Sequence, residues 1–529
     1  MSQNTKDEFF ENNVLGHPAG LFVLFFTEMW ERFSYYGMRA LLVLFLTTSL
    51  IKGGWAWSVE DALGLYGTYT MSVYFTPVIG GFLADKYLGY RWAVILGALA
   101  MTLGHASMAV ETPLFLYIGI GCLIIGNGLF KPNMTSIISN AYDGHEEKKD
   151  GAFSLYYMGV NAGAFLGIML CGYIGEKISW SWGFGLAGIF MFFGMLQFYF
   201  TQNIFGDIGL KPTAASKQES KDKAAKENVT PKVIRDRIIA VIIFSIFTVF
   251  FWAAFEQAGG SMTIFAEKFT QRELFGNNAS IFKIADTLLT IIPLLIITYV
   301  LIKLFSKTFK KYSTGNLILS LSFIIIWGIV LWKVMREFNS AETEVPATWF
   351  GILNSLFIVV FAPVFSKWWE SKYNLSGPMK FGLGLTLLGL GFGFLAYGSM
   401  GIDTDSVVRV SMFWLIAAYL FHTLGELCIS PVGLSYVSKL VPASWIGIMF
   451  GVYYLFIGMG NKLAGSMGGM IETITAQYSL TTFFLIFTIV PVGAGLLMVM
   501  LSPLMKKLMH GVRSVSYTHL RAHETKANL

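Results

Sequence analysis

Charged side chains are scarce in this sequence. Asp, Glu, Lys and Arg make up 13% of its 529 residues, against roughly 25% in an average soluble domain. Hydrophobic residues make up 55%, which excludes a water-soluble globular protein. Because a helix needs about 20 apolar residues to cross a bilayer, this content suffices for about fourteen membrane spans.

Cysteine is also scarce, and the excess of positive charge is small. Cys122, Cys171 and Cys428 lie in apolar stretches without CxxC spacing, so we expect neither a disulfide framework nor a metal site. Lys and Arg exceed Asp and Glu by only 38 to 32, which argues against nucleic acid as a partner. We expect no cofactor. We expect the chain to be surrounded by a lipid bilayer.

Apolar runs recur along the whole chain, so the sequence predicts an all-α, multi-pass membrane protein. Basic loops alternate with acidic or neutral ones, and short basic loops stay in the cytoplasm. Both termini are therefore predicted to be cytoplasmic. The protein is expected in a plasma membrane, and the lack of a large loop domain favours the inner membrane of a bacterium. The runs lie at 19–44, 59–84, 91–110, 114–138, 151–174, 181–203, 235–264, 281–305, 315–335, 348–368, 379–398, 407–438, 444–472 and 481–505.

Polar segments divide the chain into parts. Residues 206–234 carry six lysines and two prolines with almost no large apolar side chains, which predicts a cytoplasmic linker between two halves. Residues 1–18 are expected to form a cytoplasmic tail. Residues 509–529 are polar and follow a complete span that ends in lysines, so we interpret them as a non-native or disordered tail without function.

The first span carries charges that lipid would not tolerate, since an ionised side chain at mid-bilayer costs at least about 2.5–3.5 kcal/mol. Glu28, Glu31, Arg32, Tyr35 and Arg39 recur at steps of three and four residues, so they form one stripe on a helix. Arg32 can pair with Glu28 one turn earlier. That pairing leaves Glu31 as a carboxylate whose proton affinity depends on what else enters the site, which predicts a proton switch.

Three later spans each contain a charge: Lys131, Glu256 and Glu426. Intramembrane ionisable residues usually mark a transport pathway, so we expect all three to line one cavity with the first-span stripe. Arg32 and Lys131 could hold the carboxylate of a zwitterion and Glu426 its ammonium group, as a peptide or amino acid requires. The alternative is that these charges only pair with one another and lock helices together.

The segments around these charges resemble the motifs of the proton-coupled oligopeptide transporter family of the major facilitator superfamily, over nearly the whole chain. The longest is the first-span segment. The resemblance implies two six-helix bundles, at 19–205 and 235–508, with an additional helix pair at about 281–335 in the second. The matching segments are EMWERFSYYG at 28–37, GGFLADK at 80–86 with Gly89 and Arg91, GLFKPN at 128–133, 153–165, FWAAFEQ at 251–257 and GELCISPVG at 425–433.

The resemblance also implies roles for single residues. Glu28, Glu31 and Arg32 would couple protonation to binding, and Lys131 with Arg32 would hold the peptide carboxylate. Glu426 would hold the amino end. Arg39 and Glu256 would form a salt bridge that closes the outer side and that protonation of Glu256 releases. The residues implied to line the pocket or to bond the peptide backbone are Tyr35, Tyr36, Tyr74, Tyr157, Asn161, Trp252, Asn354 and Ser430; plain helix packing is the alternative for the aromatic ones.

The function implied is a symporter that carries protons together with di- and tripeptides by alternating access, and not an enzyme. Animal members carry a histidine in the second helix, and 59–84 contains none, so Glu31, Glu28 or Glu256 must carry the protons. His105 and His422 are interpreted as packed neutral residues, and Lys462 has no role that we can assign. The alternatives are a carrier for another small ion or drug-like substrate, such as nitrate, and an intramembrane enzyme or a receptor, which no catalytic motif or large extramembrane domain supports.

Overall fold

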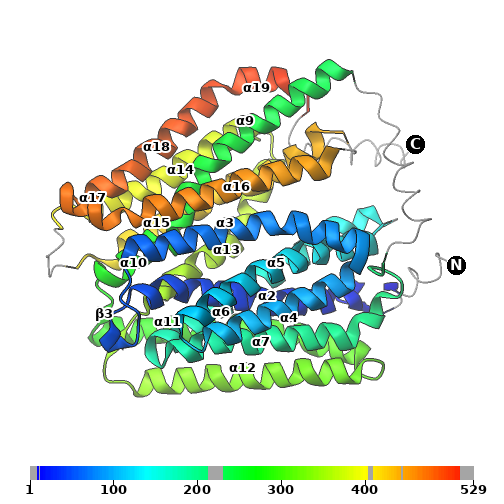
Figure 1. The fold of residues 1–529 in the computed structure, drawn as a ribbon, viewed down its shortest axis with the longest axis horizontal. Coiled ribbons are helices and arrows are strands. Elements are labelled where there is room, and N and C mark those ends of the chain that lie inside the picture. The colour runs from blue at the N-terminus through cyan, green and yellow to red at the C-terminus, as the bar shows by residue number, and fades with distance from the viewer. Residues whose placement is uncertain are drawn as a thin grey trace. The chain divides into compact units, whose positions relative to one another are not determined.

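The computed structural model describes residues 9–10, 12–143, 145–211, 230–402, 409–442 and 445–512. Within these ranges the chain is almost entirely helical, with two antiparallel pairs of two-residue strands (Figure 1). The predicted all-α class is therefore confirmed. Residues 212–229 of the predicted linker, the predicted tail beyond residue 512 and residues 1–8 lie outside the described part.

The chain folds into two compact units that alternate along the sequence. Unit 1 comprises Met1–Trp57, Phe75–Ala214 and Arg272–Ile352, and unit 2 comprises Ser58–Tyr74, Ala215–Gln271 and Leu353–Leu529. One helix, α3 (Val59–Leu83), is shared between them, and it changes unit just before its internal Pro77. Proline removes a hydrogen bond from a helix interior and bends the helix, so this is a natural place for the division.

Unit 1 is a bundle in which α2 packs on α6 and α7, and α4 packs on α5 and α7. Gly163 and Gly167 of α6 lie so close to the backbone of α2 that an added methyl group would collide with the carbonyl oxygens of Met29 and Phe33. Small residues thus bring the helices together. Its elements are β1 (Asn13–Val14), β2 (His17–Pro18), α2 (Ala19–Thr47), η1 (Leu50–Lys52), η2 (Ala84–Leu88), α4 (Tyr90–Met108), α5 (Pro113–Ala141), α6 (Glu146–Lys177), α7 (Trp180–Thr201), η3 (Gln202–Phe205), β3 (Glu273–Leu274), α11 (Gly276–Thr308), α12 (Ser313–Asn339), β4 (Thr343–Glu344) and η5 (Ala347–Gly351).

Unit 2 is a second bundle, in which α14 packs on α15 and α18, and α16 packs on α9. The first part of α3 belongs to it, because Gly67 of α3 meets Gly465 of α16 backbone to backbone. The remaining elements are α9 (Pro231–Phe255), η4 (Glu256–Gly259), α10 (Ser261–Lys268), α13 (Ile352–Glu370), α14 (Gly377–Gly398), α15 (Met412–Leu440), α16 (Ile446–Gly469), α17 (Ile471–Gln477), α18 (Leu480–Met500) and α19 (Ser502–Leu508).

Each of the predicted apolar runs coincides with a long helix or with a helix and its short continuation. Among the described residues, 10 of these helical segments are long and apolar enough to cross a membrane. The four runs that fall outside this set form α2, α3, α4 and α16. Four charged residues at 28, 31, 32 and 39 lower the apolar character of α2, although it is almost completely buried. The helices of lower hydropathy therefore include the one that carries the predicted proton switch.

The additional helix pair, α11 and α12, belongs with unit 1, and Figure 1 shows α12 lying beside α7. The sequence grouped this pair with the second bundle only because it follows Glu256 along the chain. The physical reason for the difference is apolar packing. Phe323 of α12 meets Phe26 and Trp30 of α2, each at a ring-centre distance of 5.7 Å, so the buried face of the hairpin completes the core of unit 1.

A buried ion pair joins the two helices of this hairpin. Lys333 Nζ lies 2.6 Å from Asp286 Oδ2, and both side chains are buried. Trp349 Nε1 donates to the other carboxylate oxygen at 3.1 Å, and the ammonium group lies over the ring of Tyr173 on α6. Each charge of the pair therefore has a further partner, a hydrogen bond on the carboxylate and an aromatic ring beside the ammonium group, as buried charges need.

We expect Lys333→Met to destabilise the protein by about 3–5 kcal/mol, because it leaves the Asp286 carboxylate buried without its partner. The double variant Asp286→Asn/Lys333→Met removes both charges and should regain most of that loss. Thermal unfolding in detergent, followed by tryptophan fluorescence, measures both. Equal melting of Lys333→Met and wild type would show that the pair contributes nothing to stability.

The segment Arg272–Ile352, which returns the chain from unit 2 to unit 1, is also held to the end of α6 through residues near both of its ends. Glu176 accepts hydrogen bonds from the backbone N–H and the hydroxyl of Thr348, at 2.9 and 2.6 Å. Lys177 and Arg272 lie 2.6 and 2.9 Å from the two carboxylate oxygens of Glu344. Burial raises the pKa of Glu344, but the hydrogen bond from Lys177 and the charge of Arg272 outweigh it and hold the pKa below its usual value. The segment thus enters and leaves unit 1 through fixed polar contacts.

Candidate functional site

The charged stripe of α2 gathers two carboxylates on one guanidinium group. Arg32 Nε lies 2.8 Å from Glu28 Oε1 and 2.5 Å from Glu31 Oε2. All three side chains are at least nine-tenths buried. The predicted Glu28–Arg32 pair is confirmed, whereas Glu31, expected to stand beside the pair, belongs to it. Two carboxylates thus compete for one guanidinium group.

Side chains from two neighbouring helices complete this cluster. Asn127 of α5 donates to Glu31 Oε1 at 3.4 Å, and Lys131, one turn further, interacts electrostatically with both carboxylates and with Arg32. Tyr156 of α6 hydrogen-bonds to Glu28. Within the described part of the chain, Arg32 Nη2 is buried without a hydrogen-bond partner. This donor and the ammonium group of Lys131 are the groups of the cluster that would bind an anionic ligand.

The predicted aromatic residues of unit 1 are not equivalent. Tyr35 is buried beneath the Arg32 guanidinium, which lies 5.5 Å from its ring centre, and Tyr36 carries Arg39 in the same way at 5.8 Å. Tyr157 is exposed. Asn161, one turn further on α6, donates its amide to the Tyr157 carbonyl at 3.0 Å. Tyr35 and Tyr36 therefore hold the cations of α2 in place, while the ring of Tyr157 is open to a ligand.

In unit 2, Glu256 lies where its membrane span is interrupted. Helix α9 ends at Phe255, Glu256 opens the short η4, and the chain resumes as α10 after Gly260. The Glu256 side chain is buried and accepts a hydrogen bond from Tyr66 of α3 at 3.1 Å. Gln257 stabilises the break by donating to the Ala464 carbonyl of α16 at 2.9 Å. Discontinuous helices commonly form the coupling-ion sites of transporters.

Glu426 of α15 is oriented by a neighbouring helix. Asn354 of α13 donates to Glu426 Oε2 at 2.8 Å and to the Thr423 hydroxyl at 3.2 Å. Ser430, one turn after Glu426, has a buried hydroxyl without a hydrogen-bond partner among the described residues. The amide of Asn354 thus fixes the carboxylate as an acceptor, which is the form that an ammonium group requires.

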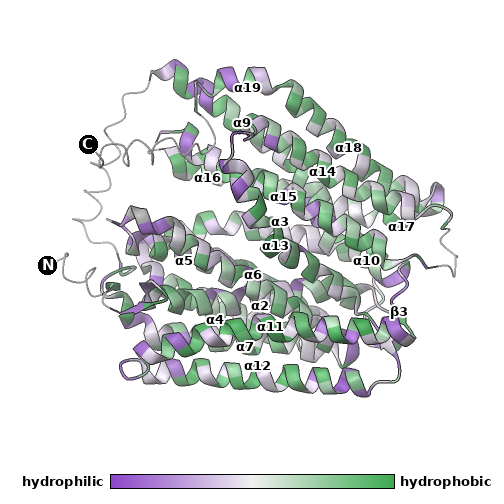
Figure 2. Cartoon of the chain, turned by 180° about the vertical axis from the view of Figure 1, so that it is seen from behind, coloured by the Kyte–Doolittle hydropathy of each residue, from purple (hydrophilic) through white to green (hydrophobic). Residues whose placement is uncertain are grey.

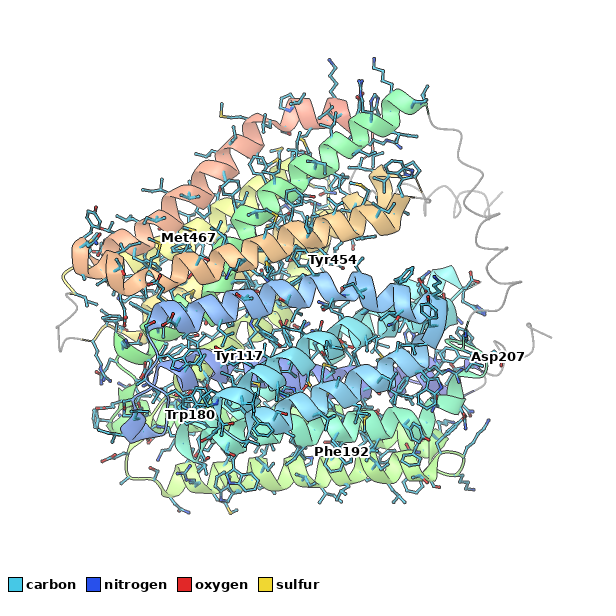
Figure 3. The ribbon with its side chains drawn as sticks, in the orientation of Figure 1. Tyr117, Trp180, Phe192, Asp207, Tyr454 and Met467 are labelled. Carbon is cyan, nitrogen blue, oxygen red and sulfur yellow. The ribbon has the colours of Figure 1, made fainter. Side chains whose placement is uncertain are left out.

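An aromatic group accompanies these polar residues in unit 2. The ring centre of Tyr74 lies 6.5 Å from that of Trp252 and 6.1 Å from that of Tyr454, which Figure 3 labels. All three side chains are partly exposed. Aromatic faces bind apolar side chains of many shapes because they impose few hydrogen-bond requirements. Tyr74 and Trp252, each named as a pocket residue by the sequence, therefore lie in one group with Tyr454, which the sequence did not indicate.

The predicted site residues fall into two groups. Glu28, Glu31, Arg32, Lys131 and the aromatic residues at 35, 36 and 157 lie in unit 1, and Glu256, Glu426 and the residues at 74, 252, 354 and 430 lie in unit 2. Within each unit the structure brings charged residues and their partners together. The common cavity and the bridge from Arg39 to Glu256 join residues of different units and stay predictions. Among the described residues, no cluster of His, Cys, Asp and Glu suited to a metal is found.

Four partners were missed by sequence reasoning: Asn127, Tyr156, Tyr66 and Thr423. Asn127 stands one turn before Lys131 and Thr423 three residues before Glu426, so helical spacing was a usable signal for both. Tyr156 precedes the predicted Tyr157, and only the rotation of α6 decides which of the two meets Glu28. Tyr66 meets Glu256 from a distant part of the chain, so nothing in the local sequence pointed to it.

Three residues outside the predicted site also have a defined place. His105 and His422 are buried, and neither ring makes a hydrogen bond within the described part of the chain, as expected of packed neutral residues. Lys462 of α16 donates to the Thr68 hydroxyl of α3 at 2.8 Å and lies 3.4 Å from the Gly64 carbonyl. Its ammonium group therefore links two helices inside unit 2.

Comparison with known proteins gives consistent results. The sequence pattern of the POT family matches residues 91–221 and 329–485. The chain is 31% identical to "Uncharacterized transporter YclF" of Bacillus subtilis (strain 168), covering 95% of this chain and 97% of that protein. It is 28% identical to "Di-/tripeptide transporter" of Lactococcus lactis subsp. lactis (strain IL1403), covering 95% and 99%.

Solved structures show the same relation. A crystal structure described as "peptide transporter POT in complex with sulfate" superimposes with a TM-score of 0.74 at 28% identity, covering 96% of this chain and 99% of that one. The fold predicted from the resemblance, a major facilitator arrangement with additional helices, is therefore confirmed. Because the family pattern covers more than half of the sequence and the relatives match almost end to end, the chain belongs to the POT family.

Proposed function

We propose that this protein is a secondary active transporter that imports di- and tripeptides together with protons. The observation that carries the proposal is the pair of complementary sites: a cationic one in unit 1 around Arg32 and Lys131, and an anionic one in unit 2 around Glu426. A short peptide is a zwitterion, so each of its ends finds an opposite charge. The relatives named as di- and tripeptide transporters support this substrate class.

The coupling follows from competition for the same charges. A proton on Glu31 removes one of the two negative charges that hold Arg32, which strengthens the attraction of Arg32 for a carboxylate. Protonation of Glu256 weakens its contacts in the same manner. A carrier in which proton and peptide each change the other's affinity can use the downhill movement of one to drive the other.

The proposed architecture keeps the linker at 206–234 between bundles at 19–205 and 235–508, except that the helix pair α11 and α12 is an accessory to the first bundle and not part of the second. The loops rich in Lys and Arg support cytoplasmic termini. Bacterial relatives support a bacterial inner membrane as the location. The non-native or disordered character of 509–529 is part of the same proposal, and transport without bond making or breaking makes the protein a carrier and not an enzyme.

Uptake of labelled di-alanine into proteoliposomes tests this function. With an acidic exterior, peptide should accumulate about tenfold per pH unit for each proton carried, because that step is worth about 1.4 kcal/mol. A protonophore should abolish the accumulation, and liposomes without protein serve as the control. A carrier for nitrate or another small ion would not accumulate di-alanine but would accumulate labelled nitrate in the same proteoliposomes, which would overturn the peptide assignment.

A further inference from the structure

The end of α11 and the turn that follows it carry a cluster of positive charge that the transport site does not use. Lys303, Lys307, Lys310 and Lys311, named here the basic turn, are all exposed. Among the described residues none of them forms an ion pair, and no Asp or Glu occurs between residues 287 and 336 of the sequence. The hairpin therefore ends in four uncompensated ammonium groups.

The basic turn continues an apolar face of α11. Ile292, Ile296 and Tyr299 are each at least half exposed, and they precede Lys303 and Lys307 at steps of three and four residues. Residues with this spacing share one side of a helix. The opposite side, with Leu294, Leu301 and Leu304, is buried, so α11 presents an outward face that is apolar along its length and cationic at its end. Figure 2 shows the same change, from hydrophobic helices to a hydrophilic turn.

Aromatic side chains mark the depth of the basic turn in a bilayer. Lys303 Nζ lies 5.3 Å from the ring centre of Tyr299, and Lys311 Nζ lies 5.8 Å from that of Tyr312. Tyrosines concentrate at the membrane–water interface, and lysine side chains near helix ends extend toward the headgroups. We therefore expect the ammonium groups at headgroup level and the apolar face of α11 at the level of the acyl chains.

We propose that the basic turn is a binding site for an anionic phospholipid, whose phosphate contacts the lysines and whose acyl chain lies along the face of Ile292, Ile296 and Tyr299. Clusters of four or more lysines directly beside a membrane helix attract anionic headgroups, and here the apolar face adds a place for the chain. The lipid belongs to the cytoplasmic leaflet if the proposed orientation of the transporter holds. The binding itself depends neither on that orientation nor on the transport function.

Native mass spectrometry of the full-length protein tests the proposal. The protein is equilibrated with equal amounts of phosphatidylglycerol and phosphatidylcholine, and the bound lipid is counted. We expect wild type to retain phosphatidylglycerol. The variant K303Q/K307Q/K310Q/K311Q should retain at least fivefold less phosphatidylglycerol per protein than wild type. The matched control K232Q/K372Q/K506Q/K507Q removes four exposed lysines of unit 2 and should retain it as wild type does.

Three outcomes would overturn the proposal: equal retention by the basic-turn variant and wild type, equal loss in the control, or retention of phosphatidylcholine at the same level. A mass of two chains that only the basic-turn variant loses would assign the surface to a second copy of the protein. If the fourfold variant does not fold, the double variant K303Q/K307Q gives the same comparison with a smaller loss. Peptide uptake is not measured, so failure of the lipid site and failure of the proposed transport function remain distinguishable.

Discussion

Glu31→Gln is expected to abolish peptide accumulation driven by a pH gradient while leaving exchange of labelled for unlabelled peptide intact. Glutamine has nearly the shape of a protonated glutamate but cannot release the proton. Arg32 would then keep only Glu28 as a charged partner, in a site where Glu31 is fully buried and also bound by Asn127. The carrier would be fixed in its proton-loaded form, which binds peptide but gains nothing from the gradient.

The measurement compares two modes in the same proteoliposomes. Under an imposed pH step, the accumulation ratio of the variant should fall to about 1, the value without coupling. Counterflow, with unlabelled peptide inside, should keep a rate similar to that of wild type. Glu337→Gln, which alters a glutamate bound to Tyr173 far along the chain, is the matched control and should couple normally. Persistent uphill uptake by Glu31→Gln would assign the coupling to Glu28 or Glu256.

The sequence predicted the composition of the site better than its geometry. The stripe of α2 was readable because helical spacing places residues 28, 31, 32, 35 and 39 on one side, whatever the helix packs against. The arrangement of Glu31 on Arg32 was not readable, since it depends on rotamers and on the approach of α5 and α6. For the same reason Tyr156 was missed while its neighbour Tyr157 was named.

The placement of the additional hairpin shows a second limit. Apolar runs gave the helices α11 and α12, but both have apolar residues on several sides, so periodicity alone does not select the partner. Phe323 packs against Trp30, almost three hundred residues earlier, and this contact decides that the hairpin joins unit 1. The ion pair of Asp286 and Lys333 was not predicted at all, because the two residues stand 47 positions apart on different helices and no local spacing connects them. Long-range packing overrides chain order here.

The second large effect concerns the two ends of the substrate. Glu426→Gln should remove the discrimination in favour of a free amino end, because the amide that replaces the carboxylate no longer offers a charged acceptor. Asn354 would still donate to the oxygen at position 426, so the side chain should keep its place. A hydrogen bond to a charged group is worth about 1.5–3 kcal/mol, which predicts a loss of about 10- to 150-fold in affinity for a free dipeptide.

Lys131→Gln should act on the other end of the same peptide. Its ammonium group belongs to the cationic cluster with Arg32, so its loss should weaken binding of a free carboxyl end and leave recognition of the amino end unchanged. The two variants therefore predict a crossed pattern. Competition is measured with four ligands: a dipeptide, its N-acetylated form, its C-terminal amide and the form modified at both ends.

The crossed pattern separates recognition of a zwitterion from a general loss of transport. In Glu426→Gln, acetylation of the competitor should no longer matter, whereas amidation should matter as in wild type. In Lys131→Gln, amidation should matter less than in wild type, because only Arg32 remains to hold the carboxylate, and acetylation should matter as in wild type. Glu472→Gln, at an exposed ion pair with Lys268, is the control and should discriminate like wild type. If both variants lost affinity for all four ligands equally, the charges would be acting on helix packing, and the assignment of the two ends would be wrong.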